Sequence, residues 1–140
     1  MEENFSLKEW ITHFLKQRDL YEHKIISIND EDDKVLVKFD DKEAIYFIIP
    51  EMKDLGFLEN IDKNTSLGIV ILNKKANLNF LVKNWDFFVQ FQSLTIYFVN
   101  TQSQTEIKWM VNPKVHNFIC ERSALKAGLT ALFSTVEEVN

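Results

Sequence analysis

The chain has 140 residues, a formal net charge of −5, 46% hydrophobic and 13% aromatic residues, but only three glycines and two prolines. This composition excludes disordered, collagen-like and low-complexity proteins. The glycines, at positions 56, 68 and 128, lie too far apart to form a glycine-rich phosphate loop.

Charge is distributed unevenly along the chain. Residues 1–70 carry 16 acidic and 9 basic side chains, whereas residues 71–140 carry 5 acidic and 7 basic ones. An acidic first half repels phosphate, and the second half is too weakly basic to offset this repulsion. The sequence therefore argues against nucleic acid as a partner.

The single cysteine, Cys120, excludes an internal disulfide and fits a reducing compartment. The longest apolar run, residues 44–49, is far shorter than the roughly 20 residues that span a bilayer. The acidic N-terminus, residues 1–4, does not resemble a signal or transit peptide. We expect a cytoplasmic protein without a membrane partner, folded as one globular domain over residues 1–140.

The first predicted element is a helix that runs to about residue 19. Ser6 and Glu9 match a capping box, and Phe5 and Trp10 occupy the positions of a hydrophobic staple around it. The helix then carries one apolar stripe, formed by Leu7, Trp10, Ile11, Phe14 and Leu15.

Three strands are predicted next, over residues 24–28, 34–39 and 43–49. Short acidic turns separate them, which predicts an antiparallel meander. The third run is apolar on both faces and is typical of an interior strand.

The second half alternates helices and strands. Pro50 starts a short helical stripe, which is followed by a strand over 66–73, a helix over 76–91, and strands over 94–100 and 106–112. Asn112 and Pro113 then form a good helix start, and apolar spacing continues almost to the C-terminus, with a break near Ser123 or Gly128.

These elements predict an α/β fold, with α+β as the alternative. We expect a single mixed sheet of about six strands with helices packed on it, in the order α-β-β-β-α-β-α-β-β-α. The helix over 76–91 should act as a right-handed crossover that makes strand 94–100 parallel to strand 66–73.

The element order over residues 5–73 resembles that of the restriction-endonuclease-like nucleases. The resemblance implies an Asp on the second core strand and a Glu-x-Lys on the third, which together hold Mg²⁺. The candidates here are Asp33, Asp40 and Glu43, but no lysine follows Glu43 at the required spacing, and Tyr46, Phe47 and Ile48 fill the strand interior. A divergent or degenerate metal-dependent nuclease or hydrolase is the enzymatic alternative.

A similar order of elements resembles that of the type III secretion chaperones, which are small acidic dimers that bind partner segments in apolar grooves. The size and the pI of about 5.2 agree with that class. The helix over 76–91 does not fit it cleanly. A chaperone-like binding protein is therefore a second alternative.

The last predicted helix carries the other candidate residues. His116 and Cys120 have the spacing of one helix face, but a metal would need further ligands, so we predict no metal site and no cofactor. Ser123 and Lys126 match a Ser-x-x-Lys pattern that chance alone would supply. Arg122 and Lys126, with Lys114 and His116 nearby, could form a small basic binding surface.

The sequence thus favours a non-enzymatic role. No convincing catalytic set is present, and the aromatic content is high for a small domain. We predict a protein-interaction domain that binds a protein partner or itself, with the identity of any small-molecule ligand left open.

Overall fold

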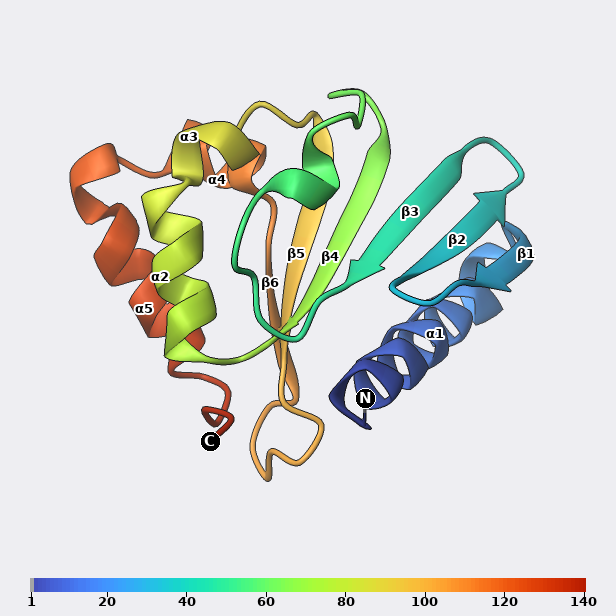
Figure 1. Ribbon diagram of the computed structural model, residues 1–140, viewed down its shortest axis with the longest axis horizontal. Coiled ribbons are helices and arrows are strands. Elements are labelled where there is room, and N and C mark those ends of the chain that lie inside the picture. Colours follow the sequence, from blue (N-terminus) through green and yellow to red (C-terminus); the bar gives the residue numbers. More distant parts are fainter. Residues whose placement is uncertain (1) are drawn as a thin grey trace.

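The structure is a mixed six-stranded sheet with helices on both faces (Figure 1), which confirms the predicted fold class and order of elements. It is a computed structural model that describes the backbone of residues 2–140 and the side chains from residue 6 onward. The strands lie in sequence order across the sheet. They are β1 (Ile25–Asp30), β2 (Lys34–Phe39), β3 (Glu43–Ile48), β4 (Ser66–Leu72), β5 (Ser93–Val99) and β6 (Lys108–Val111).

The directions of the strands divide the sheet into a parallel centre and antiparallel edges. β3, β4 and β5 run parallel to one another, while the β1–β2–β3 meander and the β5–β6 pair are antiparallel. The predicted parallel pairing of the strands on either side of the crossover helix is confirmed.

The helices cover the two faces unequally. α1 (Glu2–Glu22) packs alone on one face, and α2 (Lys75–Lys83), α3 (Trp85–Phe88) and α5 (Leu125–Phe133) pack on the other, with α4 (Pro113–Ile119) beside α3 (Figure 1). Two short 3₁₀ turns, η1 (Gly56–Leu58) and η2 (Arg122–Ala124), complete the described elements. None of the described helices combines the length and apolar character needed to cross a membrane.

β4 is apolar on both faces because it contributes to two separate cores. Leu67, Ile69 and Ile71 join the core beneath α2, α3 and α5, whereas Val70 and Leu72 join the core beneath α1. Parallel strands are buried on both faces in this way, so they appear in sequence as nearly continuous apolar runs.

The start of the first helix differs from the prediction. α1 begins at Glu2, so Ser6 lies within the helix and is not its N-cap. The Ser6 hydroxyl lies 3.1 Å from the Thr101 hydroxyl on the loop between β5 and β6, and this tertiary contact replaces the capping box. The predicted staple involves the Phe5 side chain, which lies outside the described residues.

Three predicted helices are shorter than expected. The helix after Pro50 is reduced to η1, and the crossover helix divides at Asn84, whose side-chain amide donates to the Phe80 carbonyl at 3.0 Å. The last helix ends at Ile119, because the backbone of Cys120 is extended, and it resumes as η2 and α5. Gly128, one of the two predicted break points, lies inside α5.

Two fully buried asparagines organise the carboxyl end of β4. The Asn73 carboxamide accepts from Trp109 Nε1 at 2.7 Å and donates to the Val136 carbonyl at 3.0 Å. The Asn77 carboxamide accepts from the Met52 amide and donates to the Leu72 carbonyl, both at 2.8 Å. Buried carboxamides need such partners, so these bonds fix the loop after β3 and the C-terminal tail on the sheet.

One glycine has a clear steric role. Tyr46 of β3 lies across Gly68 of β4, its register partner, and a Cβ atom at Gly68 would stand 2.3 Å from Tyr46 Cδ2. Real Cβ atoms do not approach other heavy atoms this closely. The residue at position 68 must therefore lack a side chain for Tyr46 to hold its place.

Replacing Gly68 by alanine should lower the free energy of unfolding by about 2–3 kcal/mol, because the Tyr46 ring must move out of a packed core. Urea unfolding followed by circular dichroism measures this loss. Gly128→Ala is the matched control: a Cβ there meets no atom within 4 Å, and alanine in a helix stabilises by up to about 1 kcal/mol. Equal effects of the two substitutions would contradict the steric role of Gly68.

Tyr46 and Tyr97 are buried side by side beneath α1, with ring centroids 6.4 Å apart. Burial raises the pKa of Tyr97 to about 12, and the neighbouring Tyr46 adds to this increase, whereas Arg18 opposes it. Burial also raises the pKa of Tyr46, and the nearby Arg18 guanidinium again opposes the shift. Both phenols therefore stay protonated well beyond neutral pH.

Stability should fall as the pH rises from about 10 to about 12, because over this window the folded protein retains the Tyr97 proton that the unfolded chain releases. Tyr97→Phe should flatten this alkaline loss without changing the pH dependence below pH 10. Urea midpoints across the alkaline range would test this. An unchanged alkaline slope in the variant would show that Tyr97 is not its source.

Candidate functional site

The three carboxylates of the nuclease hypothesis lie at two separate places. Asp33 immediately precedes β2 and Asp40 immediately follows it, so a strand of six residues, about 20 Å long, separates them. Glu43 begins β3 at the Asp40 end, and all three side chains are exposed. Within residues 6–140, no group of three or more His, Cys, Asp or Glu side chains is placed to hold a metal ion.

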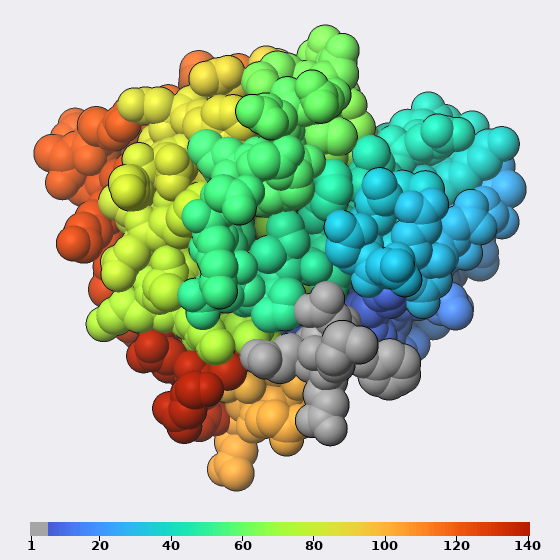
Figure 2. All heavy atoms as spheres, in the orientation of Figure 1, coloured from blue at the N-terminus to red at the C-terminus, as the bar shows by residue number. Residues whose placement is uncertain are grey.

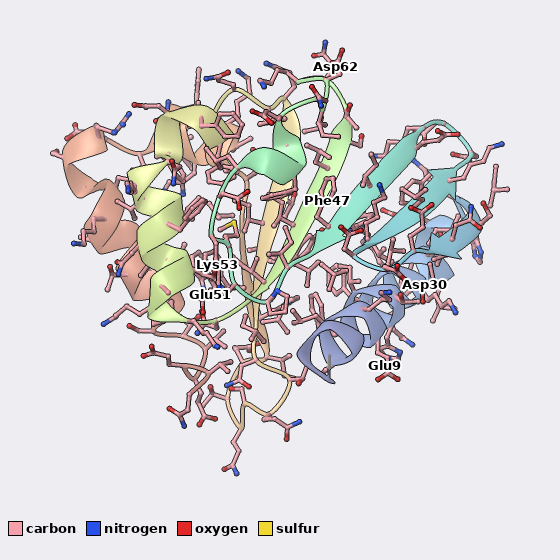
Figure 3. The ribbon with its side chains drawn as sticks, viewed as in Figure 1. Glu9, Asp30, Phe47, Glu51, Lys53 and Asp62 are labelled. Carbon is pink, nitrogen blue, oxygen red and sulfur yellow. The ribbon has the colours of Figure 1, made fainter. Side chains whose placement is uncertain are left out.

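The strand that would carry the Glu-x-Lys pattern is instead part of the core beneath α1. Its inward-facing residues are Ala44, Tyr46 and Ile48, all of them buried. A Glu-Met-Lys sequence does occur at 51–53, but it follows β3 and the Glu51 carboxylate lies 4.0 Å from Lys74 Nζ. Figure 3 shows Glu51 and Lys53 on the loop beside α2, well apart from Glu9 and Asp30. The chain offers no converging carboxylates at these positions.

His116 and Cys120 do not form a pair. Cys120 has left the helix, with φ −117° and ψ 132°, and its thiol donates to the Glu121 carbonyl at 3.5 Å. The His116 ring stands edge-on to Trp85 with centroids 5.7 Å apart, and its buried Nε2 has no protein partner. The two residues therefore act separately, and His116 contributes to the contact between α3 and α4.

Arg122 forms an ion pair that connects two helical segments. Its Nη1 lies 2.8 Å from Asp86 Oδ1, which links η2 to α3. The hydrogen bond from Arg122 holds the pKa of Asp86 below its usual value, and the same bond raises the pKa of Arg122. Arg122 therefore has a carboxylate partner, while Lys114 and Lys126 are exposed cations on α4 and α5.

The outer side of α4 carries the most exposed apolar side chains of the second half of the chain. Phe118 is 90% exposed, Ile119 is 76% exposed and Val115 is 55% exposed. We call these three residues the α4 patch. The three positions have the i, i+3 and i+4 spacing of one helix face, so their side chains form a single apolar patch.

Local interactions explain why α4 presents these residues. Asn112 Oδ1 accepts from the Val115 amide at 3.2 Å and Pro113 occupies the first turn, so the predicted helix start is confirmed. On the inner side, Trp85 Nε1 donates to Asn117 Oδ1 at 3.0 Å. These bonds fix the orientation of a two-turn helix and leave its apolar residues outward.

Sequence reasoning misjudged this surface. The apolar spacing predicts that Val115, Phe118 and Ile119 continue the buried stripe of Leu125 and Leu129. The break at Cys120 separates the two groups, so only Leu125 and Leu129 reach the core. A break at Ser123 was the sequence signal closest to this boundary.

A second surface, of mixed polar and apolar residues, lies where the end of α1 meets β1. Leu20 and Ile26 are exposed, and they line a hollow of about 520 Å³ between the end of α1 and β1. We call it the α1–β1 hollow. Its lining consists of Lys16, Asp19, Leu20, His23, Ile25, Ile26, Ser27 and Ile28.

Comparison with known proteins adds no relative. No protein-family model, curated protein or solved structure matches this chain. The function must therefore be inferred from the surfaces themselves.

Removing the Phe118 ring should leave the stability of the fold intact, because an exposed side chain loses little burial. We expect Phe118→Ser to change the free energy of unfolding by less than about 0.5 kcal/mol. Leu129→Ala, at a fully buried position of α5, should lower it by about 2–5 kcal/mol. Urea unfolding compares the two, and a large loss in the Phe118 variant would mean that the α4 patch belongs to the core.

Proposed function

We propose that this protein is a non-catalytic interaction domain that associates with copies of itself, the α4 patch of one copy binding in the α1–β1 hollow of the next. The observation that supports it most is the 90% exposure of Phe118 on a helix whose orientation is fixed from within. An aromatic anchor that inserts into a concave surface is a common form of protein contact, and Leu20 and Ile26 are the exposed apolar residues of the hollow that it would meet.

The segments that carry the two surfaces differ in charge. Residues 113–126, which include the α4 patch, carry three basic and one acidic side chain. Residues 19–33 carry six acidic and one basic side chain, although the lining of the hollow itself holds one acid, Asp19, and one lysine, Lys16. Two α4 patches facing each other would instead bring like charges together, so charge favours contact between unlike surfaces.

The positions of the two surfaces determine the kind of assembly. The elements that carry them lie on different sides of the molecule: α4 lies behind α3 on one side of the sheet centre, and β1 with the end of α1 lies on the other side (Figure 1; blue in Figure 2). A contact between unlike surfaces is heterologous, and it produces rings or open chains of subunits. Few side chains take part, and stable interfaces bury about 1,200–2,000 Å², so we expect a weak, concentration-dependent association.

The self-association should appear as a rise in average mass from low micromolar to millimolar protein concentration, measured by sedimentation equilibrium. Phe118→Asp should abolish it by placing a charge in the anchor, and Leu20→Asp should abolish it by placing one in the hollow. Ile107→Asp is the matched control, because Ile107 is an exposed apolar residue outside both surfaces.

Mixing the two defective variants separates the possible geometries. The Leu20→Asp chain keeps its α4 patch and the Phe118→Asp chain keeps its hollow, so an equimolar mixture should form one-to-one complexes that grow no further. A symmetric contact through α4 would instead leave the Leu20→Asp variant able to dimerise alone. A wild-type protein that stays strictly monomeric at millimolar concentration would refute the proposal.

A further inference from the structure

A second cavity, unrelated to the α4 patch and the α1–β1 hollow, lies on the α1 face of the sheet. It encloses about 230 Å³ near the amino ends of β3, β4 and β5. Its lining is almost entirely polar and contains no acidic residue. The lining residues are Arg18, Lys42, Ala44, Tyr46, Ser66, Leu67, Gln92, Ser93, Thr95, Tyr97 and Asn112.

The strand register explains why short hydroxyl side chains gather on one wall. Ser66 of β4 is paired with Ser93 of β5, and Gly68 is paired with Thr95. Side chains alternate between the faces of a sheet, so residues two apart share a face. Ser66, Ser93 and Thr95 therefore lie on the same face of the sheet as Tyr46 and Tyr97, which is the face that α1 covers.

The two tyrosines are held rigidly beside this wall. Tyr46 rests on Gly68, and the ring of Tyr97 stands edge-on to Phe14, with centroids 5.9 Å apart. Both side chains are less than a tenth exposed, and both phenols carry their protons at neutral pH. They can therefore donate hydrogen bonds without losing side-chain entropy on binding.

Two cations complete the cavity. Arg18 comes from α1, where its guanidinium lies 5.6 Å from the Phe14 ring centroid, and Lys42 comes from the turn between β2 and β3. Arg18 Nε is 3.9 Å from Glu22, with both side chains close to half exposed. An exposed pair at this distance contributes little. The Arg18 side chain also hydrogen-bonds to the phenols of Tyr46 and Tyr97, which places the guanidinium at the cavity. The described residues place no carboxylate within ion-pair distance of Lys42.

We infer that this cavity binds a small phosphate-bearing anion. A guanidinium, an ammonium and several hydroxyl and amide groups line one cavity whose lining has no acidic residue, Glu22 lying outside it, and such a set satisfies the oxygens of a phosphate group. Arginine binds phosphate and carboxylate alike through two parallel hydrogen bonds, but a phosphate group adds further oxygens and a larger negative charge, which the hydroxyl groups and Lys42 can satisfy. The volume is below the roughly 300–1,000 Å³ of sites for drug-sized ligands, so the ligand is a phosphate or a small phosphomonoester.

The test is isothermal titration calorimetry on the full chain with four probes at equal ionic strength: inorganic phosphate, glycerol phosphate, acetate and chloride. We expect saturable binding of a phosphate probe, with acetate and chloride at least ten-fold weaker. Tighter binding of glycerol phosphate would identify a phosphomonoester as the preferred source of the group, and equal binding would identify free phosphate. Phosphate binding no tighter than chloride or acetate would overturn the inference.

Variants locate the binding in this cavity. Arg18→Gln should weaken phosphate binding at least ten-fold, and Tyr97→Phe, which removes one hydroxyl donor and no charge, should weaken it several-fold. Lys38→Gln is the matched control, because it removes one positive charge from the opposite face of β2 and should leave the affinity unchanged. Equal weakening by Lys38→Gln and Arg18→Gln would indicate only a general effect of charge and would overturn the inference.

The wild-type protein is titrated at low micromolar concentration, where self-association is expected to be least, and Phe118→Asp is titrated beside it. Equal phosphate affinity in the two would show that the cavity works independently of the α4 patch. If Phe118→Asp instead lost phosphate binding, the cavity could not be the site, since Phe118 is not among its lining residues.

Discussion

The buried carboxamides at the carboxyl end of β4 connect four segments that are remote in the sequence. Asn73 joins β6 and the C-terminal tail through Trp109 and Val136, and Asn77 joins the loop after β3 to the start of α2 through Met52 and Leu72. In open α/β sheets this edge is the usual place for a ligand. Here the chain's own tail covers it, so binding surfaces must be sought elsewhere.

The unequal covering of the two sheet faces decides where those surfaces lie. Several helices share the core on one face, and the division of the last predicted helix leaves α4 with an apolar exterior. On the other face α1 is alone and cannot cover the whole sheet. The uncovered end of that face holds a polar cavity with cationic and hydroxyl groups. The unequal distribution of helices over the two faces of the sheet thus accounts for the positions of both the α4 patch and the cavity.

The self-association and the anion site depend on different chemistry and can be separated experimentally. The proposed self-association would require the α4 patch to meet the α1–β1 hollow, and the uneven distribution of acidic and basic residues along the chain favours that contact. The inferred anion binding would require fixed donors, which Tyr46 and Tyr97 could provide because burial keeps their hydroxyls protonated. Gly68 matters to that inference indirectly, since a side chain at that position would displace the Tyr46 ring.

The sequence by itself determined the sheet, its order of elements and the parallel crossover, because apolar periodicity and chain connectivity are local signals. It also placed the helix start at Asn112 and Pro113 correctly. Only the tertiary structure decided the rest. It turned Phe118 outward, moved Ser6 into a helix and brought Arg18 to the cavity beside Tyr97. Those outcomes depend on contacts between distant segments, which the pattern of a single sequence does not contain.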